Sequence, residues 1–188
     1  MQPYRIEWGS HSLDMRGKTL VMGIVNVTPD SFSDGGCFFD PDAALAHGEK
    51  LAEDGADILD IGGESTRPFS EKISVEEEIK RVVPVIKKLS ERVAVPISID
   101  TAKAAVAEQA IEAGASIIND IGAFRLDSKL PDIAVKYGVP VILMHMKGSP
   151  KDMQISPRYD DLFGEIREFL CDAVKRAVER GVERSKII

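Results

Sequence analysis

Short apolar runs alternate along this chain with segments of helical periodicity, and this alternation constrains the fold more than any other feature. Runs of this length with few charges are typical of parallel strands that are buried on both faces. Strict alternation of strands and helices predicts an α/β protein built on a parallel sheet. The runs cover residues 20–27, 57–63, 96–101, 116–121 and 140–145.

Residues that start and stop helices stand between these runs. Ser74 and Glu77 have the spacing of a capping box, and Thr101 is the expected N-cap of the helix that follows the third run. Gly114 is expected to end that helix. Further helices are expected from Pro41 to Gly55, at 127–137 and at about 160–180, so that a helix follows each strand.

The first expected strand is not followed by a G-x-G-x-x-G turn, which weakens a dinucleotide-binding interpretation. A TIM (β/α)₈ barrel fits the alternation better, although such barrels run to about 250 residues. With 188 residues, we expect the first five βα units and the start of a sixth strand at 186–188. We predict a single barrel domain over residues 1–188 that is incomplete at its C-terminus.

Composition argues against several classes of function. The chain has 24 Lys and Arg against 31 Asp and Glu, and this net charge of -7 argues against sequence-independent binding to nucleic acid. No apolar run approaches the roughly 18 residues that a membrane span needs, and the first ten residues lack a signal pattern. Cys37 and Cys171 are expected to be free thiols of a cytoplasmic protein.

A polar side chain stands at or near the carboxyl end of every expected strand. In a parallel barrel these ends meet on one face, where catalytic groups lie. A polar group in an apolar run costs a few kcal/mol unless it is satisfied, so five of them together indicate a site. Structural alternatives stay open, since they could cap helices or turns, anchor backbone or line a pocket wall. The five are Asn26, Asp60, Asp100, Asn119 and His145.

The residue types suggest which chemistry this face supports. Asp100 and Asn119 offer acceptors and an amide donor, which can read the amide and amino edge of a guanine-like heterocycle. Arg67 suits an oxyanion such as phosphate. Asn26 and Asp34 carry oxygens of the kind that Mg²⁺ accepts alongside phosphate oxygens. Together they predict displacement of a phosphorylated leaving group from a heterocyclic substrate.

Two segments resemble the signatures of dihydropteroate synthases. Residues 26–36, Asn-Val-Thr-Pro-Asp-Ser-Phe-Ser-Asp-Gly-Gly, resemble the first signature, and residues 57–68, which end in Thr-Arg-Pro, resemble the second. The strand ends at 98–101, 118–120 and 144–146 also match that family. The resemblance covers essentially the whole chain.

This resemblance implies roles for the matched residues in binding the pterin substrate. It implies that Asp100 and Asn119 bind the pterin ring and that Met144 lines its pocket. Thr66 is expected to contact the pterin diphosphate. Asn26 is expected to bind the diphosphate and a Mg²⁺ ion, the cofactor that the family implies.

The resemblance also implies a second substrate site, for 4-aminobenzoate. Phe32 and Asp34, with Arg67 and Pro68, are expected to shape it. Asn26, Asp34 and Arg67 are the expected catalytic residues. The implied reaction of folate biosynthesis joins 6-hydroxymethyl-7,8-dihydropterin diphosphate to 4-aminobenzoate and yields 7,8-dihydropteroate and diphosphate. Sulfonamides, which mimic 4-aminobenzoate, would inhibit it, and the full-length protein is expected to form a homodimer.

Alternatives of other classes stay open. The family's sixth to eighth strands supply further binding residues that these 188 residues lack, so the chain could be a non-catalytic pterin-binding fragment. A methyltetrahydrofolate-binding methyltransferase would share the barrel, but would not need residues 31–36 or the Thr-Arg-Pro segment. A metal-dependent aldolase fits only on grounds of fold, which does not assign function.

Overall fold

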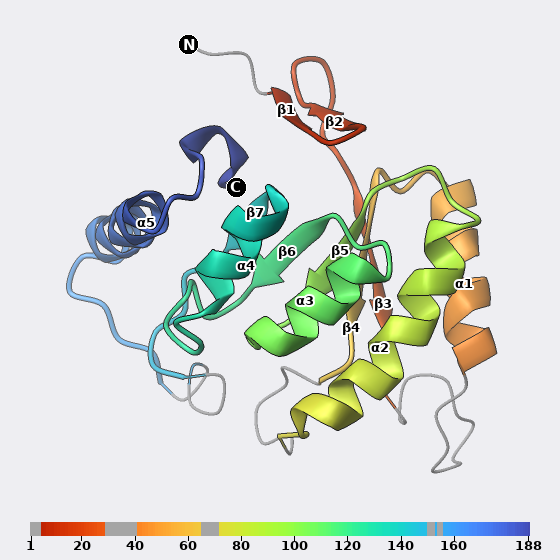
Figure 1. Cartoon of the computed structure of the whole chain (residues 1–188). Coiled ribbons are helices and arrows are strands. Elements are labelled where there is room, and N and C mark those ends of the chain that lie inside the picture. Colours follow the sequence, from red (N-terminus) through yellow and green to blue (C-terminus); the bar gives the residue numbers. More distant parts are fainter. Residues whose placement is uncertain (1–4, 29–40, 65–71, 150–152, 154–155) are drawn as a thin grey trace.

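A five-stranded parallel sheet forms the centre of the computed structural model, which describes residues 5–28, 41–64, 72–149, 153 and 156–188 (Figure 1). The strands follow one another across the sheet in chain order, and every neighbouring pair is parallel. Each strand lies inside one of the expected runs, which confirms the α/β prediction. The strands are β3 (Met22–Asn26), β4 (Ile58–Gly62), β5 (Ile97–Asp100), β6 (Ile117–Asp120) and β7 (Val141–Leu143).

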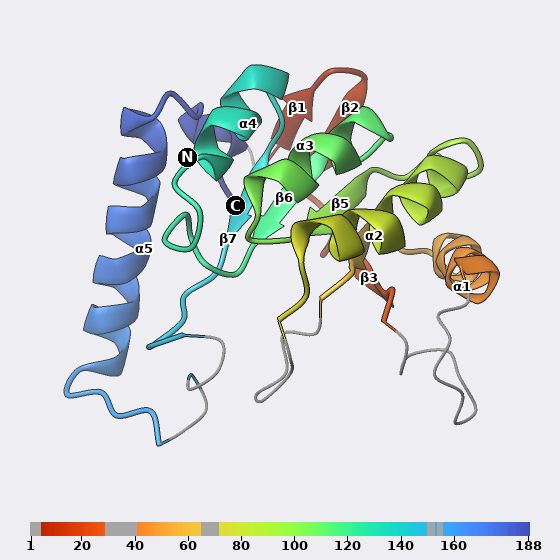
Figure 2. The same ribbon diagram turned by 60° about the horizontal axis from the view of Figure 1, so that its bottom comes forward.

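A helix follows each strand, and the helices lie around one side of the sheet (Figure 2). Ser74 caps the second helix as expected, because its hydroxyl accepts a hydrogen bond from the Glu77 N–H at 3.1 Å. The five βα units confirm the expected part of a barrel. The helices are α1 (Pro41–Glu53), α2 (Val75–Ser90), α3 (Ala104–Glu112), α4 (Leu130–Tyr137) and α5 (Leu162–Glu179).

The two faces of the sheet differ in burial. Val25, Ile61 and Ile99 are fully buried in the core. On β3 the alternate residues face the other way, and Ile24 is 59% exposed there, with Asn26 also exposed. Asp60 and Ser98 lie deeper on this same face and are buried, so the carboxyl end of the face, where Asn26 is exposed, is the part open to a ligand.

The N-terminal segment forms a hairpin that the strand–helix pattern did not predict. Strands β1 (Arg5–Trp8) and β2 (His11–Asp14) pair antiparallel, and Ile6, Trp8 and Leu13 are buried. Gly9 takes a φ of +50° in the two-residue connection, which suits glycine. The alternation of polar and apolar residues around Gly-Ser was the available signal.

The last residues begin another strand beside β7, as expected. After the short 3₁₀ helix η1 (Arg184–Lys186), Ile187 forms a parallel bridge with Val141. Ile188 donates its N–H to the Val141 carbonyl at 2.9 Å and accepts from the Leu143 N–H at 2.9 Å. These bonds continue the parallel order of the sheet.

The predicted N-cap of α3 was wrong. The helix begins at Ala104, whose N–H donates to the Asp127 carboxylate at 2.8 Å, and the N-cap residue Lys103 makes no side-chain cap bond. Thr101 is buried, and its hydroxyl donates instead to Glu78 at 2.7 Å. A buried carboxylate needs such a donor, and Asp127 supplies the cap from outside α4, which starts three residues later than expected.

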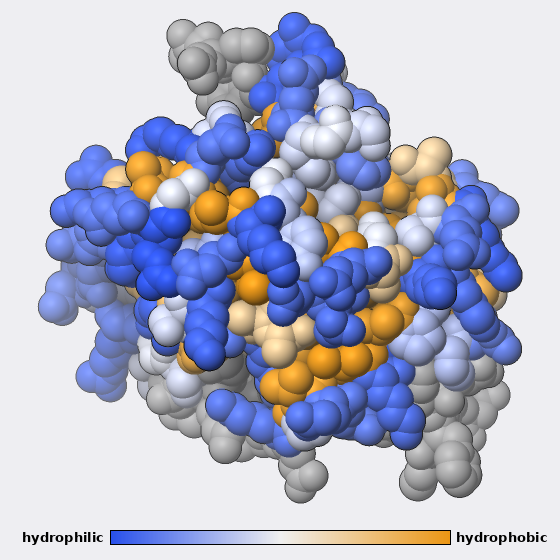
Figure 3. Space-filling model, in the orientation of Figure 1, coloured by the Kyte–Doolittle hydropathy of each residue, from blue (hydrophilic) through white to orange (hydrophobic). Residues whose placement is uncertain are grey.

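Figure 3 shows a surface with many hydrophilic side chains and apolar patches between them. No described helix is both long enough and apolar enough to cross a membrane.

Gly114, which joins α3 to β6, has a φ of +121°, and a Cβ added there would lie 2.5 Å from the Ser90 side chain. We expect Gly114→Ala to lower the free energy of unfolding by about 2–4 kcal/mol, because backbone strain and a clash combine. Gly55→Ala is the matched control, since Gly55 has a φ of +101° with no atom within 4 Å of the added Cβ. Its expected loss is about 1 kcal/mol. Urea unfolding measures both, and equal losses would show that the clash contributes nothing.

Candidate functional site

The carboxyl ends of three strands bring three predicted site residues to one level of the sheet. Gly62 on β4 pairs with Asn26 on one side and with Asp100 on the other, and Asp100 pairs in turn with Asn119. A Cβ on Gly62 would lie 3.5 Å from Asp100 Oδ2 and 3.9 Å from Asn26 Oδ1. The missing side chain of Gly62 therefore leaves a cradle toward which an oxygen from each neighbouring strand turns.

Asp100 lies in an acidic environment. Burial raises the pKa of Asp100, and the negative charges of Asp60, Glu78, Asp120 and Glu64 raise it further, to about 7. A carboxyl whose pKa lies near neutrality can accept a hydrogen bond when ionised and donate one when protonated. Such a shift in a group at a strand end is typical of a functional site.

A buried ion-pair network lies beside these strand ends, and sequence reasoning missed it. Glu78 on α2 is only 1% exposed, and Lys103 Nζ contacts its Oε2 at 2.6 Å. The same ammonium group donates to the Glu64 carboxylate and, at 2.9 Å, to the Ile73 carbonyl. Lys103 thus joins the chain just after β4 to the chain just before α2. A glutamate on the apolar stripe of an amphipathic helix was the available signal.

Asp60 lies one step deeper than Gly62 on the same face of β4, and it is 5% exposed. Its Oδ2 accepts a hydrogen bond from Asn119 Nδ2 at 3.0 Å. Ser98 pairs with Asp60 across to β5. Burial raises the pKa of Asp60, against the lowering effects of the Ser98 hydroxyl and the Asn119 amide. Asp60 therefore hydrogen-bonds the side chain of Asn119, a predicted binding residue.

The end of β7 carries Met144 and His145. Met144 is partly buried, and its N–H donates to the Asp120 carbonyl at 3.4 Å, which ties this end to β6. His145 packs edge-on against Phe169 of α5, with ring centroids 4.9 Å apart, and lies 6.0 Å from the Tyr159 ring. His145 thus packs against aromatic side chains of α5 and of the segment before it.

Five predicted site residues lie outside the described part of the structure, so their expected roles stay predictions. They are Phe32, Asp34, Thr66, Arg67 and Pro68.

Comparison with known proteins identifies the family. Residues 22–188 match the pterin binding enzyme family. The chain belongs to this family. The fold and the polar strand ends described above are thus those of a member of the pterin-binding enzymes.

Three similar proteins from different bacteria are dihydropteroate synthases. The dihydropteroate synthase of Bacillus subtilis is 49% identical over 177 residues, which are 94% of this chain and 60% of that protein. A Yersinia pestis dihydropteroate synthase in a sulfonamide drug complex superposes with a TM-score of 0.88 at 46% identity, covering 97% of this chain and 65% of that one. A Xanthomonas albilineans dihydropteroate synthase with 4-aminobenzoic acid gives 0.89 at 45% identity, covering 99% and 65%.

This member of the pterin-binding enzymes spans about three-fifths of the length of the curated relatives that it matches. Its five βα units nonetheless superpose closely on those solved structures, which confirms the expected barrel architecture over the part that is present.

Among the described strand ends, the side-chain oxygen of Asn26 is a suitable ligand for Mg²⁺. Asn26 presents an amide oxygen at the exposed end of β3, above the cradle at Gly62. Within the described residues, no group of three or more His, Cys, Asp or Glu side chains could hold a metal. Mg²⁺ commonly takes one or two protein oxygens and completes its shell with water and substrate phosphates. Asn26 fits the role of such a single protein ligand.

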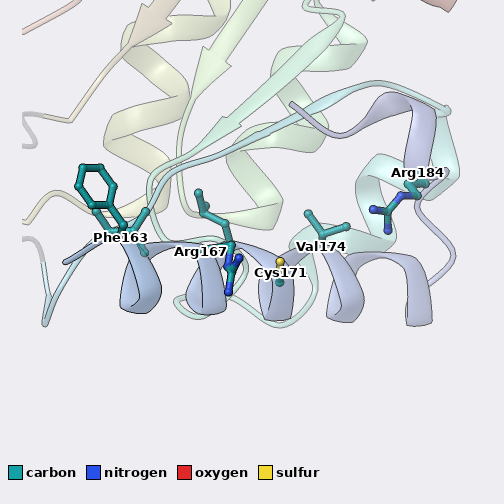
Figure 4. Close-up of a pocket in the computed structure, with 7 residues that line it drawn as sticks. Phe163, Arg167, Cys171, Val174 and Arg184 are labelled. Carbon is teal, nitrogen blue, oxygen red and sulfur yellow. The ribbon is translucent and has the colours of Figure 1, made fainter. Parts of the chain in front are cut away.

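A separate apolar pocket lies along α5 and holds none of the predicted site residues (Figure 4). Phe163 is 82% exposed beside it, and Cys171 is a free, exposed thiol, as expected. Two of its lining residues, Arg167 and Arg184, carry a charge. The lining residues are Phe163, Ile166, Arg167, Leu170, Cys171, Val174 and Arg184.

Proposed function

We propose that this chain carries the pterin-binding strand ends of a dihydropteroate synthase. The enzyme would join 6-hydroxymethyl-7,8-dihydropterin diphosphate to 4-aminobenzoate, as the resemblance implies. The observation that carries the proposal is the convergence of Asn26, Asp100 and Asn119 at one level of the sheet around Gly62. The similarity to dihydropteroate synthases over nearly the whole chain supports the same assignment.

In this proposal the chain's own residues bind and orient the pterin. Asp100 and Asn119 hydrogen-bond the edge of the heterocycle, and their rigid strands fix its position. The partial protonation of Asp100 lets it meet either a donor or an acceptor on that edge. Met144 contributes an adaptable apolar contact beside them. These contacts hold the reacting methylene carbon in place while its bonds change.

The reaction exchanges one bond at that carbon. The C–O bond to the diphosphate breaks with both electrons leaving on oxygen, and a C–N bond to the arylamine forms, after which the amine releases a proton to water. When bound, Mg²⁺ supplies positive charge that stabilises the leaving diphosphate. In this proposal Asn26, exposed at the end of β3, would hold that ion or hydrogen-bond the diphosphate itself.

Diphosphate release tests the proposal. The protein is incubated with the pterin diphosphate and Mg²⁺, with and without 4-aminobenzoate. We expect release to require the arylamine and to fall by about 100-fold in Asn26→Ala. Lys136→Ala, on the exposed outer side of α4, is the matched control and should leave release unchanged.

Two other outcomes of this assay would argue against a dihydropteroate synthase activity of this chain. Pterin binding without release would favour a non-catalytic binding module, and release that needs no arylamine would contradict the synthase assignment. A methyltetrahydrofolate-binding methyltransferase would transfer a methyl group and release no diphosphate.

The remaining expectations belong to the same proposal. The expected roles of Phe32, Asp34, Thr66, Arg67 and Pro68 at the diphosphate and 4-aminobenzoate sites rest on the resemblance. We also propose that the protein works in the cytoplasm and that the longer enzyme is a homodimer.

A further inference from the structure

Asp60 is a buried carboxylate that the proposed reaction does not use. It stands in the middle of β4 and is 5% exposed. Within the described residues it takes part in no ion pair, and its Oδ1 makes no hydrogen bond of good geometry. Burying an unpaired carboxylate costs free energy, so stability of the fold does not explain it. Its Oδ2 accepts a hydrogen bond of good geometry from the side chain of Asn119.

This contact decides how the Asn119 side chain faces the strand ends. An asparagine amide carries two N–H donors and one carbonyl acceptor, and it can turn by 180° to exchange them. An ionised carboxylate accepts hydrogen bonds only. Because Asn119 Nδ2 donates to Asp60 Oδ2 at 3.0 Å, the nitrogen end of the amide faces into the sheet. The carbonyl oxygen and the second N–H then remain for a ligand, in one fixed order.

We propose that Asp60 is a positioning residue that locks the Asn119 amide in one of its two orientations and so selects which edge of a heterocycle binds. This inference rests on the proposed function, since the ligand is taken to be a pterin. The carbonyl oxygen of Asn119 can accept from an amino group, and its free N–H can donate to a neighbouring ring nitrogen that carries no hydrogen. A pterin, with its 2-amino group, presents such an edge. The same order opposes a 2-oxo edge, where donor and acceptor are exchanged, as in a lumazine.

Ligand preference tests this role, because a purely structural residue would not change it. Binding of 6-hydroxymethylpterin and of 6-hydroxymethyllumazine is measured by calorimetry. The wild type is expected to prefer the pterin by about 100-fold. Asp60→Asn keeps the shape but can present either a donor or an acceptor to Asn119, so the preference should fall to about tenfold or less. A preference that stays at its wild-type value, with both affinities lowered alike, would overturn the proposal.

Ser98→Ala is the matched control. It alters the buried neighbour of Asp60 on β5 without removing the acceptor of the Asn119 hydrogen bond, so the preference should stay as in the wild type. A preference that falls equally in Ser98→Ala and in Asp60→Asn would also overturn the proposal, since any buried change nearby would then act alike.

A ligand-free measurement separates this inference from the proposed function. The side-chain amide of Asn119, assigned in nitrogen-15 NMR spectra with the help of Asn119→Ala, should have one slowly exchanging proton in the wild type. That protection should disappear in Asp60→Ala. A wild type that binds no pterin contradicts the proposed function, whereas rapid exchange of both Asn119 protons in the wild type overturns the role of Asp60 even if the variants fail to fold.

Discussion

Asp100→Asn raises the free energy of unfolding at pH 8 by about 2–4 kcal/mol. The pKa of Asp100 in the folded chain is about 7, against an ordinary value of 3.8. The folded state therefore binds this proton more tightly than the unfolded state. The stability that this group contributes is present below pH 4 and is lost as pH rises toward 7. Asparagine carries no charge, so it removes the loss.

Urea unfolding between pH 4 and pH 8 measures this effect. The stability of the wild type should fall relative to Asp100→Asn across that interval, and the two should differ little at pH 4. Asp172→Asn, on an exposed position of α5, is the control and should follow the wild type. If Asp100→Asn also followed the wild type, the acidic surroundings of Asp100 would not oppose its ionisation.

Lys103→Met lowers the free energy of unfolding by about 3 kcal/mol. Methionine keeps the length of the stem but removes the ammonium group that neutralises Glu78, which stays 1% exposed on α2. A buried carboxylate without its partner is costly. Lys136→Met is the matched control, because its ion pair with Glu108 is exposed, and it should cost less than about 1 kcal/mol.

Combining the change with Glu78→Leu should restore much of the lost stability, since the buried Glu78 carboxylate that lost its partner is then removed as well. Chemical denaturation compares the single and double variants. If Lys103→Met unfolded like the wild type, the ion pair would contribute nothing to the stability of the chain at the ends of β4 and β5.

The architecture could be predicted from the sequence because its signals are local. Each buried parallel strand is a short apolar run, and capping residues such as Ser74 mark the helices between them. The N-terminal hairpin was missed because its strands alternate exposed and buried residues and so lack the continuous apolar run that marked the parallel strands. The cap of α3 could not be predicted, since Asp127 reaches Ala104 from a loop 23 residues further along the chain.

The site was predictable only in part, for a related reason. Residue type and position at strand ends pointed to Asn26, Asp100 and Asn119, because parallel order alone brings such ends together. Strand register is a three-dimensional property, and it decides that Asp60 contacts Asn119, 59 residues away in sequence. The pairing of Lys103 with Glu78 depends likewise on how α2 packs, which spacing does not reveal.

Equilibrium titration of 6-hydroxymethylpterin into the wild type and into Asp100→Asn tests most directly whether the carboxyl ends of β5 and β6 hold a pterin. We expect saturable binding to the wild type and an affinity about 100-fold lower in Asp100→Asn, although that variant is the more stable protein at pH 8. Loss of affinity in a stabilised variant cannot be ascribed to unfolding. Equal affinities in the two proteins would contradict a pterin site at these strand ends.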